Sequence, residues 1–158
     1  MKFIAGIDGG GTKTKVVVAS PEGEALLSQV FGPFNLNSIG AERFAALLDE
    51  ICTWLNQQGQ CLALCIGSAG ISNQEMTRLV AEGMQRGGIK NWKLVGDQVI
   101  ALNGALEGRP GIALIAGTGS ICFGKNAAGQ FARSGGWGHL IGDEGSGYAL
   151  GRDALTAV

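Results

Sequence analysis

Three glycine-rich strings constrain this sequence more than any other feature, because glycine permits backbone conformations and close approaches that other residues resist. The chain has 28 glycines and 3 prolines among 158 residues, whereas glycine makes up roughly 7% of an average protein. The strings separate apolar segments and show no Gly-X-Y period, which excludes collagen. They are predicted ligand loops: GIDGGGTKTK from Gly6, AGTGS from Ala116 and GGWGHLIGDEGSGYALG from Gly135.

The remaining composition is typical of a globular protein. Hydrophobic residues make up 46% of the chain and charged residues 16%, and the formal net charge is -1. The 12 Lys and Arg residues are scattered, so no basic stripe predicts binding to nucleic acid or anionic lipid. No apolar run reaches the roughly 18 residues of a membrane-spanning helix. We therefore expect no nucleic-acid partner, no membrane and a cytoplasmic location.

Hydrophobic periodicity predicts an α/β fold with two lobes. Three β-rich runs form a meander, and a strand, a helix and a second strand then form a parallel crossover. Ser72 and Glu75 have the spacing of a capping box and predict the start of the crossover helix. A Gly-Arg-Pro sequence marks the boundary between lobes at 1–108 and 109–158. The expected strands are 2–8, 14–20, 25–31, 62–67, 92–96, 112–116 and 121–125, and the first helix is 41–57.

The first string differs from the two commonest phosphate loops. A Walker loop needs glycine directly before lysine and then a helix, whereas Thr12 separates Gly11 from Lys13 and a Val-rich strand follows. A dinucleotide fingerprint also needs a helix after its glycines. The remaining functional interpretation is a hairpin turn whose N–H groups and Thr12 hydroxyl bind phosphate, with Asp8 holding a hydrated Mg²⁺. The structural alternative is a plain glycine hairpin with Asp8 as a turn former.

Asp97 allows two interpretations, because it follows a predicted strand and precedes a predicted helix. At the carboxyl end of a parallel strand it would act as a general base toward a substrate hydroxyl. As the residue before a helix it would instead be an N-cap. The second string, residues 117–120, combines glycines with two hydroxyls as the first string does, and its alternative is an ordinary hairpin.

The third string combines seven glycines, Trp137, the single histidine and the pair Asp143-Glu144 in seventeen residues. Carboxylates and backbone groups provide the directional hydrogen bonds that a sugar requires, so this segment is a predicted sugar loop. The structural alternatives are a hydrogen-bonding role for His139 and capping of a following helix by one of the two acids. Because the acids are adjacent, they do not predict a paired-acid glycosidase.

The four cysteines show no CxxC spacing. Cys61 and Cys65 share one predicted strand and would lie roughly 13 Å apart, at about 3.3 Å per residue, which is too far for a disulfide. We interpret Cys52, Cys61, Cys65 and Cys122 as reduced core thiols. A metal or cluster site is the alternative.

In this order the strings resemble the superfamily of actin, sugar kinases and heat-shock-type chaperones. DGGGTKTK is similar to its first phosphate motif and AGTGS to its second, and GGWGHLIGDEGSGYALG resembles the signature loop of N-acetylglucosamine kinases in the BadF/BadG/BcrA/BcrD ATPase family. The resemblance covers essentially the whole chain. It implies a ribonuclease-H-like first lobe, the start of a similar second lobe, ATP with Mg²⁺ between them, and phosphorylation of an amino sugar, N-acetylglucosamine or glucosamine.

The resemblance also implies roles for individual residues. Asp97 matches the family's catalytic aspartate, and Ala69-Gly70-Ile71 departs from the Ser-Gly-Gly of some members. The implied ATP-binding residues are Asp8, Gly9, Gly10, Gly11, Thr12, Lys13, Gly117 and Thr118, and the implied sugar-binding residues are Asn35, Gly70, Gly119, Ser120 and Asp143.

The implied mechanism is in-line transfer of the γ-phosphoryl group to a sugar hydroxyl, with Asp97 taking the proton. One alternative is an activator ATPase that couples hydrolysis to electron transfer in acyl-CoA dehydration or reduction and carries a cluster between subunits. Another is a non-catalytic nucleotide-binding module. The family's adenosine motif lies in a second half that these residues do not include, so we expect the chain alone to be inactive, unless a homodimer builds one site from two chains.

Overall fold

The computed structural model describes residues 1–157 and divides them into two compact units, one of Met1–Ile100 and one that begins at Ala101. The first unit contains a five-stranded sheet and the second a three-stranded sheet. Because the two units are separate compact bodies, each is described by itself below.

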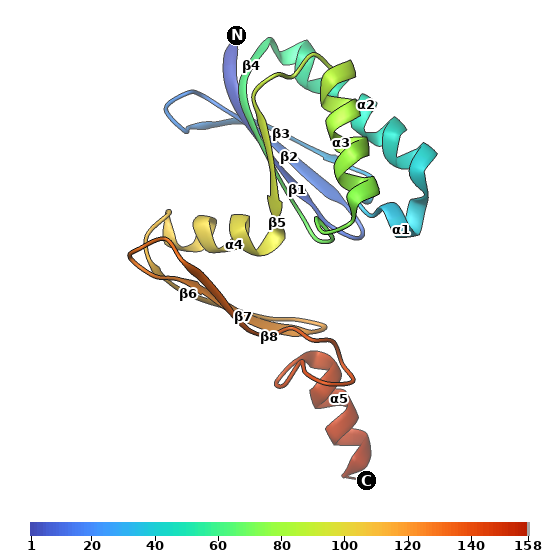
Figure 1. Cartoon of the computed structure of the whole chain (residues 1–158), viewed down its shortest axis with the longest axis vertical. Coiled ribbons are helices and arrows are strands. Elements are labelled where there is room, and N and C mark those ends of the chain that lie inside the picture. Colours follow the sequence, from blue (N-terminus) through green and yellow to red (C-terminus); the bar gives the residue numbers. More distant parts are fainter. Residues whose placement is uncertain (158) are drawn as a thin grey trace. The chain divides into compact units, whose positions relative to one another are not determined.

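The sheet of the first unit has the strand order β3-β2-β1-β4-β5 (Figure 1). The antiparallel strands β1, β2 and β3 form the predicted meander. The strands β4 and β5 are parallel to β1 and to each other, as the predicted crossover requires. The strand bounds are Lys2–Gly9 (β1), Thr14–Ala19 (β2), Ala25–Phe31 (β3), Gln60–Ser68 (β4) and Trp92–Gly96 (β5).

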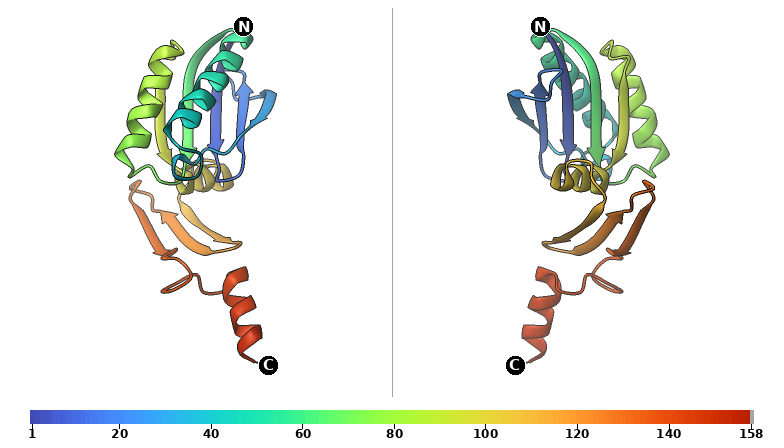
Figure 2. Two further views of the ribbon diagram at one scale, coloured as in Figure 1. Left: turned by 90° about the vertical axis from the view of Figure 1, so that its right-hand side faces the viewer. Right: turned by 90° about the vertical axis from the view of Figure 1, so that its left-hand side faces the viewer.

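Helices cover one face of this sheet. The longer helices, α2 (Ala41–Gln58) and α3 (Gln74–Arg86), lie side by side on that face (Figure 2), and the short α1 (Leu36–Ile39) precedes α2. Alternate strand residues meet the helices in a continuous apolar core, which includes Phe3, Ile7, Val16, Phe44, Leu48, Ile51, Ile66 and Val80. The intervening strand residues include exposed polar side chains and point to the opposite face of the sheet.

The start of α3 corrects one sequence prediction. Ser72 is not the capping residue; the N-cap is Asn73, whose side-chain oxygen accepts hydrogen bonds from the N–H groups of Glu75 at 2.9 Å and Met76 at 3.2 Å. The helix therefore begins one residue later than the capping-box spacing indicated. Helix α2 ends as predicted at Gly59, where the backbone φ of 126° suits glycine.

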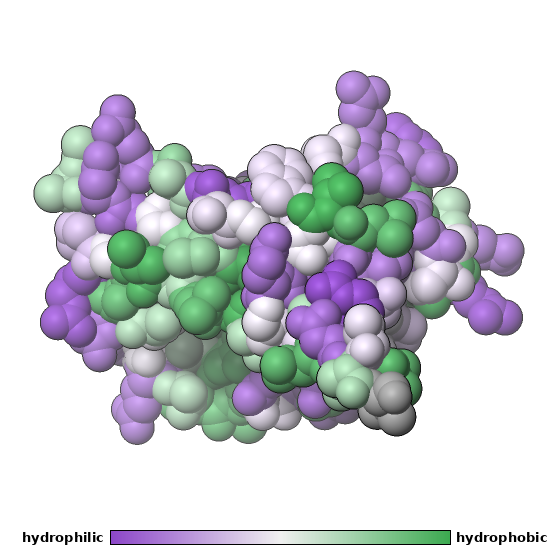
Figure 3. Space-filling model, turned by 90° about the horizontal axis from the view of Figure 1, so that it is seen from below, coloured by the Kyte–Doolittle hydropathy of each residue, from purple (hydrophilic) through white to green (hydrophobic). Residues whose placement is uncertain are grey.

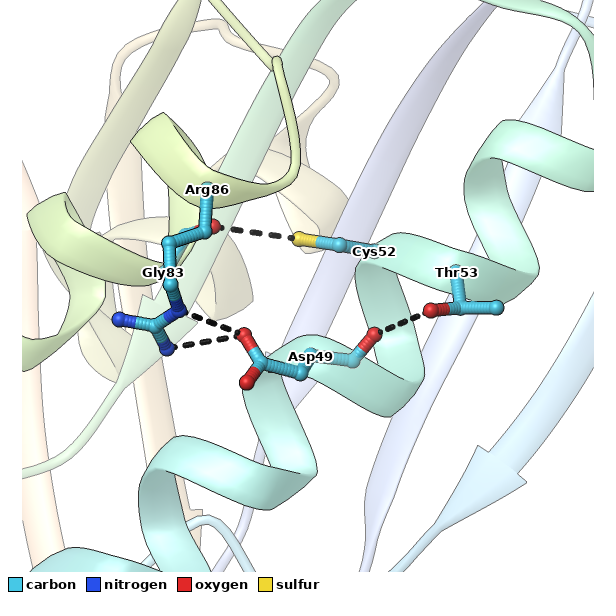
Figure 4. Close-up of polar contacts among 5 residues, drawn as sticks. All are labelled: Asp49, Cys52, Thr53, Gly83 and Arg86. Carbon is cyan, nitrogen blue, oxygen red and sulfur yellow. Dashed lines mark hydrogen bonds and ion pairs between the residues drawn. The ribbon is translucent and has the colours of Figure 1, made fainter.

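Polar contacts fasten α2 to α3 (Figure 4). The Arg86 guanidinium donates to one Asp49 carboxylate oxygen from Nε at 3.0 Å and from a terminal nitrogen at 2.8 Å. The buried Cys52 thiol lies 3.8 Å from the carbonyl oxygen of Gly83. A Cβ at Gly83 would lie 3.0 Å from the Leu48 side chain, so glycine permits the close approach of these helices.

The second unit repeats the meander of the first. Strands β6 (Gly111–Ala116), β7 (Ser120–Lys125) and β8 (Phe131–Gly135) pair antiparallel, and α5 (Gly147–Thr156) follows. The first two strands are as predicted, whereas β8 was not predicted, because its exposed FARSG sequence shows no apolar alternation. Helix α4 (Asp97–Leu106) begins in the first unit and ends in the second.

Hydrophobic side chains are exposed on the second unit. Ile112 is 74% and Leu140 84% exposed, and the space-filling view shows hydrophobic patches between polar ones on the surface that it presents (Figure 3). In the part of the chain that the structure describes, no helix combines the length and apolarity needed to span a bilayer.

The prediction of reduced core thiols is confirmed for Cys52 and wrong for Cys65, while Cys61 and Cys122 are half-buried. All four are free, and Cys52 is buried in the first unit. Cys65 is instead exposed, because its position on β4 alternates with Leu64 and Ile66, which face the helices.

Candidate functional site

The turn between β1 and β2 is built from the glycines of the first string. The Gly10 N–H donates to the Lys13 carbonyl at 3.1 Å, and the Gly10 carbonyl accepts from the Phe34 N–H at 2.9 Å. A Cβ at Gly9 would lie 2.7 Å from the Phe34 ring, and one at Gly10 would lie 2.9 Å from the Lys13 carbonyl oxygen. At Gly11 the nearest atom would be the Asn35 amide nitrogen at 3.9 Å. The first two glycines are therefore required by packing, whereas Gly11 faces open space.

A cavity of about 200 Å³ lies beside this turn in the first unit. It brings together four residues predicted from the sequence, namely Gly9 and Gly11 of the turn with Asn35 and Gly70. No charged side chain lines it among the described residues. The complete lining is Gly9, Gly11, Phe34, Asn35, Leu36, Asn37, Ala69, Gly70, Asn73 and Met76.

Two asparagines in the cavity wall are helix N-caps. The Asn35 side-chain oxygen accepts from the N–H groups of Asn37 at 3.1 Å and Ser38 at 3.3 Å, and Asn73 caps α3 in the same way. The turn that precedes α3 closes through a bond of 2.9 Å from the Asn73 N–H to the Gly70 carbonyl. Asn73 was not predicted as a site residue, although its place just before a helix is a recognisable cap signal.

Asp8 lies at the end of β1 on the sheet face opposite the helices. Its carboxylate is exposed, and its cross-strand neighbour on β2 is Lys15. Thr12 and Lys13 are also exposed. None of the three lines the cavity. An exposed carboxylate beside a glycine turn suits Mg²⁺, which keeps several of its waters and uses few protein ligands.

Asp97 stands at the same end of the sheet as the glycine turn. The register aligns Gly9 of β1 with Ser68 of β4 and Gly96 of β5, so the backbones of β1 and β5 are roughly 10 Å apart at about 4.8 Å per strand. The Asp97 carboxylate is exposed and accepts from the N–H of Gln98 at 2.8 Å. One carboxylate oxygen thus contacts the start of α4, and Asp97 does not line the cavity.

In the second unit, hydrogen bonds join the second glycine string to the third. The Gly147 N–H donates to the Gly117 carbonyl at 2.8 Å, and the Tyr148 N–H donates to the Thr118 carbonyl at 3.3 Å. Ser120 donates from its N–H to an Asp143 carboxylate oxygen at 3.3 Å and from its hydroxyl to the Glu144 carbonyl at 2.7 Å. The predicted residues Gly117, Thr118, Gly119, Ser120 and Asp143 are therefore neighbours.

The backbone of Asp143 has a φ of 65°, a left-handed conformation that aspartate tolerates better than most residues. The expectation that Asp143 or Glu144 caps α5 is wrong: the buried Ser146 is the cap, and its hydroxyl accepts from the Ala149 N–H at 3.1 Å. The structure also places the Arg133 guanidinium 4.0 Å from the Trp137 ring centroid. This contact was not predicted, because it depends on the unpredicted strand β8.

Burial raises the pKa of the Cys52 thiol to about 11, and the Asp49 carboxylate adds to this effect. Burial also raises the pKa of Cys61. Both groups are protonated at neutral pH, and a protonated thiol is a poor metal ligand. Within residues 1–157 the structure contains no group of three or more His, Cys, Asp or Glu side chains arranged to hold a metal ion.

Comparison with known proteins identifies the family. The model of the BadF/BadG/BcrA/BcrD ATPase family matches residues 5–158. The chain belongs to the BadF/BadG/BcrA/BcrD ATPase family. A Clostridium acetobutylicum protein named N-acetylmuramic acid/N-acetylglucosamine kinase is 44% identical over 164 residues, which cover 100% of this chain and 54% of that protein. A Dictyostelium discoideum N-acetyl-D-glucosamine kinase is 33% identical, with 99% of this chain and 54% of that protein covered.

Comparison with a solved structure shows that the fold of this chain agrees with the family assignment. A Chromobacterium violaceum protein, provisionally named an N-acetylglucosamine kinase, matches with a TM-score of 0.75 and 30% identity, covering 99% of this chain and 56% of that one. The chain thus spans about half the length of these relatives. Its fold is the mixed α/β fold of actin-like ATPases, as the sequence predicted.

Proposed function

We propose that this chain is the sugar-binding and phosphate-binding part of an ATP-dependent amino-sugar kinase. The observation that carries the proposal is the cavity of the first unit, where Gly9 and Gly11 of the phosphate turn share one wall with Asn35 and Gly70. A phosphoryl donor and a hydroxyl-bearing acceptor must be held together for transfer. The names of the two relatives, at 44% and 33% identity, support N-acetylglucosamine or a close derivative as the acceptor.

The glycine turns have the chemistry that nucleotide phosphates require. In the first turn, a Cβ on Gly11 would meet no atom nearer than 3.9 Å, so a ligand has room to approach the backbone there, and the exposed Thr12 hydroxyl and Lys13 ammonium add donors. Asp8 would hold Mg²⁺ through water. The second turn would contribute Gly117 and Thr118 to the phosphates and Gly119, Ser120 and Asp143 to the sugar. ATP with Mg²⁺ supplies the transferable phosphoryl group and neutralises its charge.

Asp97 is the proposed general base. Its exposed carboxylate lies at the carboxyl edge of the parallel strands, roughly 10 Å of backbone from the glycine turn across two inter-strand spacings. One carboxylate oxygen contacts the start of α4, which leaves the other for the proton of a sugar hydroxyl.

We propose that the functional lobes are residues 1–108 and 109–158 and that activity needs a protein of the relatives' length. The exposed Ile112 and Leu140 side chains support further structure on the second unit, since large exposed apolar patches mark interaction surfaces. A homodimer that builds one site from two chains is the alternative arrangement.

The experiment that tests the proposal measures ADP release with Mg²⁺ and a panel of N-acetylglucosamine, N-acetylmuramic acid, glucosamine and glucose. It compares the 158-residue chain with a version extended to the relatives' length. We expect sugar-dependent ADP release from the extended protein only. Release without any sugar would favour an ATPase activator, and binding of ATP without release would favour a non-catalytic module. Activity of the chain alone would favour the homodimer.

A further inference from the structure

Strand β3 forms one edge of the five-stranded sheet. It pairs with β2 on one side, and no other strand of the described residues pairs with its outer side. The outer side of an edge strand presents backbone N–H and C=O groups to which another chain can add a strand. Natural proteins block such edges with charged side chains, prolines, bulges or a covering element. The residues of β3 therefore decide whether this edge is open to a partner.

Most of β3 lacks these protective features. Its sequence, ALLSQVF, contains neither a charge nor a proline, and the one register shift against β2 lies at its start, which leaves residues 27–31 regularly paired. Leu26, Leu27 and Val30 expose 41%, 45% and 56% of their surface. The opposite edge strand, β5, instead carries the exposed Lys93. The sheet thus has one charged edge and one open, uncharged edge.

A groove of about 400 Å³ lies where β3 ends. Two of its residues, Gly32 and Pro33, directly follow β3, and the others belong to α1 and α2. The exposed Arg43 in its wall makes no ion pair within the part of the chain that the structure describes. The complete lining is Gly32, Pro33, Ile39, Arg43, Ala46, Leu47 and Glu50. Glu50 lies two helical turns from Arg43, so the end of the groove next to Arg43 is positively charged.

The turn between β2 and β3 carries the complementary charge. Glu22 and Glu24 are exposed there and make no ion pair with another described residue. If a second copy ran antiparallel along residues 27–31, its residue 24 would stand level with residues 32–34 of the first copy. The acidic turn of each copy would therefore reach the groove that contains Arg43 of the other. A two-fold axis repeats this contact, as an isologous interface requires.

We propose that β3 is a dimerisation strand. Two copies of this chain pair antiparallel along residues 27–31, and each places its Glu22 and Glu24 beside Arg43 of the other copy. The pairing uses both open edges, so association stops at the dimer and the continuous sheet ends in β5 on both sides. Because each copy contributes one strand and one turn, we expect a weak dimer of the small interface class.

The inference is independent of the proposed kinase function, since none of residues 20–31 lines the cavity beside the first glycine turn. It also differs from a homodimer that builds one site from two chains. Strand β6 of the second unit is uncharged as well and exposes Ile112, but further structure is proposed above to cover that unit. The experiment must therefore distinguish association through β3 from association through β6.

Sedimentation velocity measures the dissociation constant of the dimer, from about 10 μM to about 1 mM protein. It is applied to the 158-residue chain and to the version extended to the relatives' length. Val30→Lys puts a lysine of each copy into the interface and should raise the dissociation constant roughly tenfold or more. Ile112→Lys is the matched control on β6 and should leave it unchanged. Circular dichroism and thermal melts verify that each variant folds.

A charge exchange tests the contact at the groove and decides the question if Val30→Lys does not fold. Glu24→Lys and Arg43→Glu change exposed side chains, and each alone brings like charges together. Each should raise the dissociation constant roughly two- to thirtyfold, the effect of two exposed ion pairs. The double variant Glu24→Lys/Arg43→Glu restores opposite charges and should recover most of this loss.

Three results overturn the inference. The first is a chain that stays monomeric over the whole concentration range. The second is a dimer that Ile112→Lys dissociates and folded Val30→Lys leaves intact, which would place the interface on the second unit. The third is a double charge variant that associates no better than the two single variants.

Discussion

Substituting alanine for Gly9 and for Gly11 separates the two reasons for glycine in the first turn. In Gly9→Ala the new methyl would lie 2.7 Å from Cδ1 and 2.8 Å from Cγ of Phe34, against the 3.5–4.0 Å or so of an ordinary carbon contact. Phe34 is 2% exposed and packs edge-on against the buried Phe44, with ring centroids 4.8 Å apart. Phe44 therefore blocks movement of the ring on one side, and the only free space that the ring borders among the described residues is the cavity.

The expected magnitudes follow from these contacts. Overpacking of this kind destabilises by about 1–3 kcal/mol, and the lost flexibility of the unfolded chain offsets about 0.4–1 kcal/mol. From the middle of these two ranges, Gly9→Ala should lower the free energy of unfolding by roughly 1–2 kcal/mol. Gly11→Ala should leave it unchanged or raise it by up to about 1 kcal/mol, because φ at Gly11 is not in the left-handed region and the site is open. Gly11→Ala should instead weaken phosphate binding.

The assay is urea unfolding of the 158-residue chain followed by tryptophan fluorescence. A Trp137→Phe background confines the signal to Trp54 and Trp92, which pack against the core of the first unit. The double variant Gly9→Ala/Phe34→Leu tests the cause, since removing the ring should recover part of the loss as a coupling energy of about 0.5–3 kcal/mol. Equal destabilisation by both alanines, or no coupling to Phe34, would refute the packing explanation.

Three further predictions concern the base and the thiols. Asp97→Asn in the extended protein should lower kcat by roughly 10² to 10⁴, the usual share of a general base, with a smaller change in sugar KM; turnover within about threefold of wild type in a folded variant would leave Asp97 as a structural residue only. Iodoacetamide at pH 8 should alkylate the exposed Cys65 well before Cys52, whose pKa is about 11, and mass spectrometry of peptides gives the order. The pKa of Cys52 is raised above its ordinary value of 9.0, so the contribution of this thiol to stability is present below pH 9 and lost as the pH rises toward 11. We expect the free energy of unfolding to fall by about 1–2 kcal/mol over this range. In Cys52→Ala this decrease with pH should be absent.

The sequence predicts the elements whose apolar pattern is strong. Strand β5 and helix α2 were found within a residue of their bounds, because each has a clear apolar run or face that must be buried. The cap of α3 was misplaced, since Ser72 and Asn73 are both good capping residues and only the folded turn decides between them. Strand β8 was missed because its residues are exposed and are held by pairing with β7 rather than by burial.

The candidate site was predicted only in part, because some of its residues belong to visible motifs and others acquire their role only in the folded chain. Glycine strings are visible in a sequence, so Gly9 and Gly11 could be proposed as site residues before the cavity was known, whereas Gly70 came only from the family resemblance. Asn73 could not be found in this way, because its role depends on which end of its amide faces α3. Composition alone also does not show that β4 turns Cys65 outward.

The hydrogen bonds between the second and third glycine strings affect how much conformational entropy this segment would lose on binding a ligand. A segment with seven glycines in seventeen residues has the composition of a mobile lid, which would lose much conformational entropy on closing. Here four hydrogen bonds join residues 117–120 to residues 143–148. The amide protons of Ser120, Gly147 and Tyr148 should therefore exchange with solvent as one cooperative group. If this turn binds the ligand as proposed, we expect binding to carry little of the entropic cost of ordering the loop, and exchange rates measured with and without sugar test this expectation.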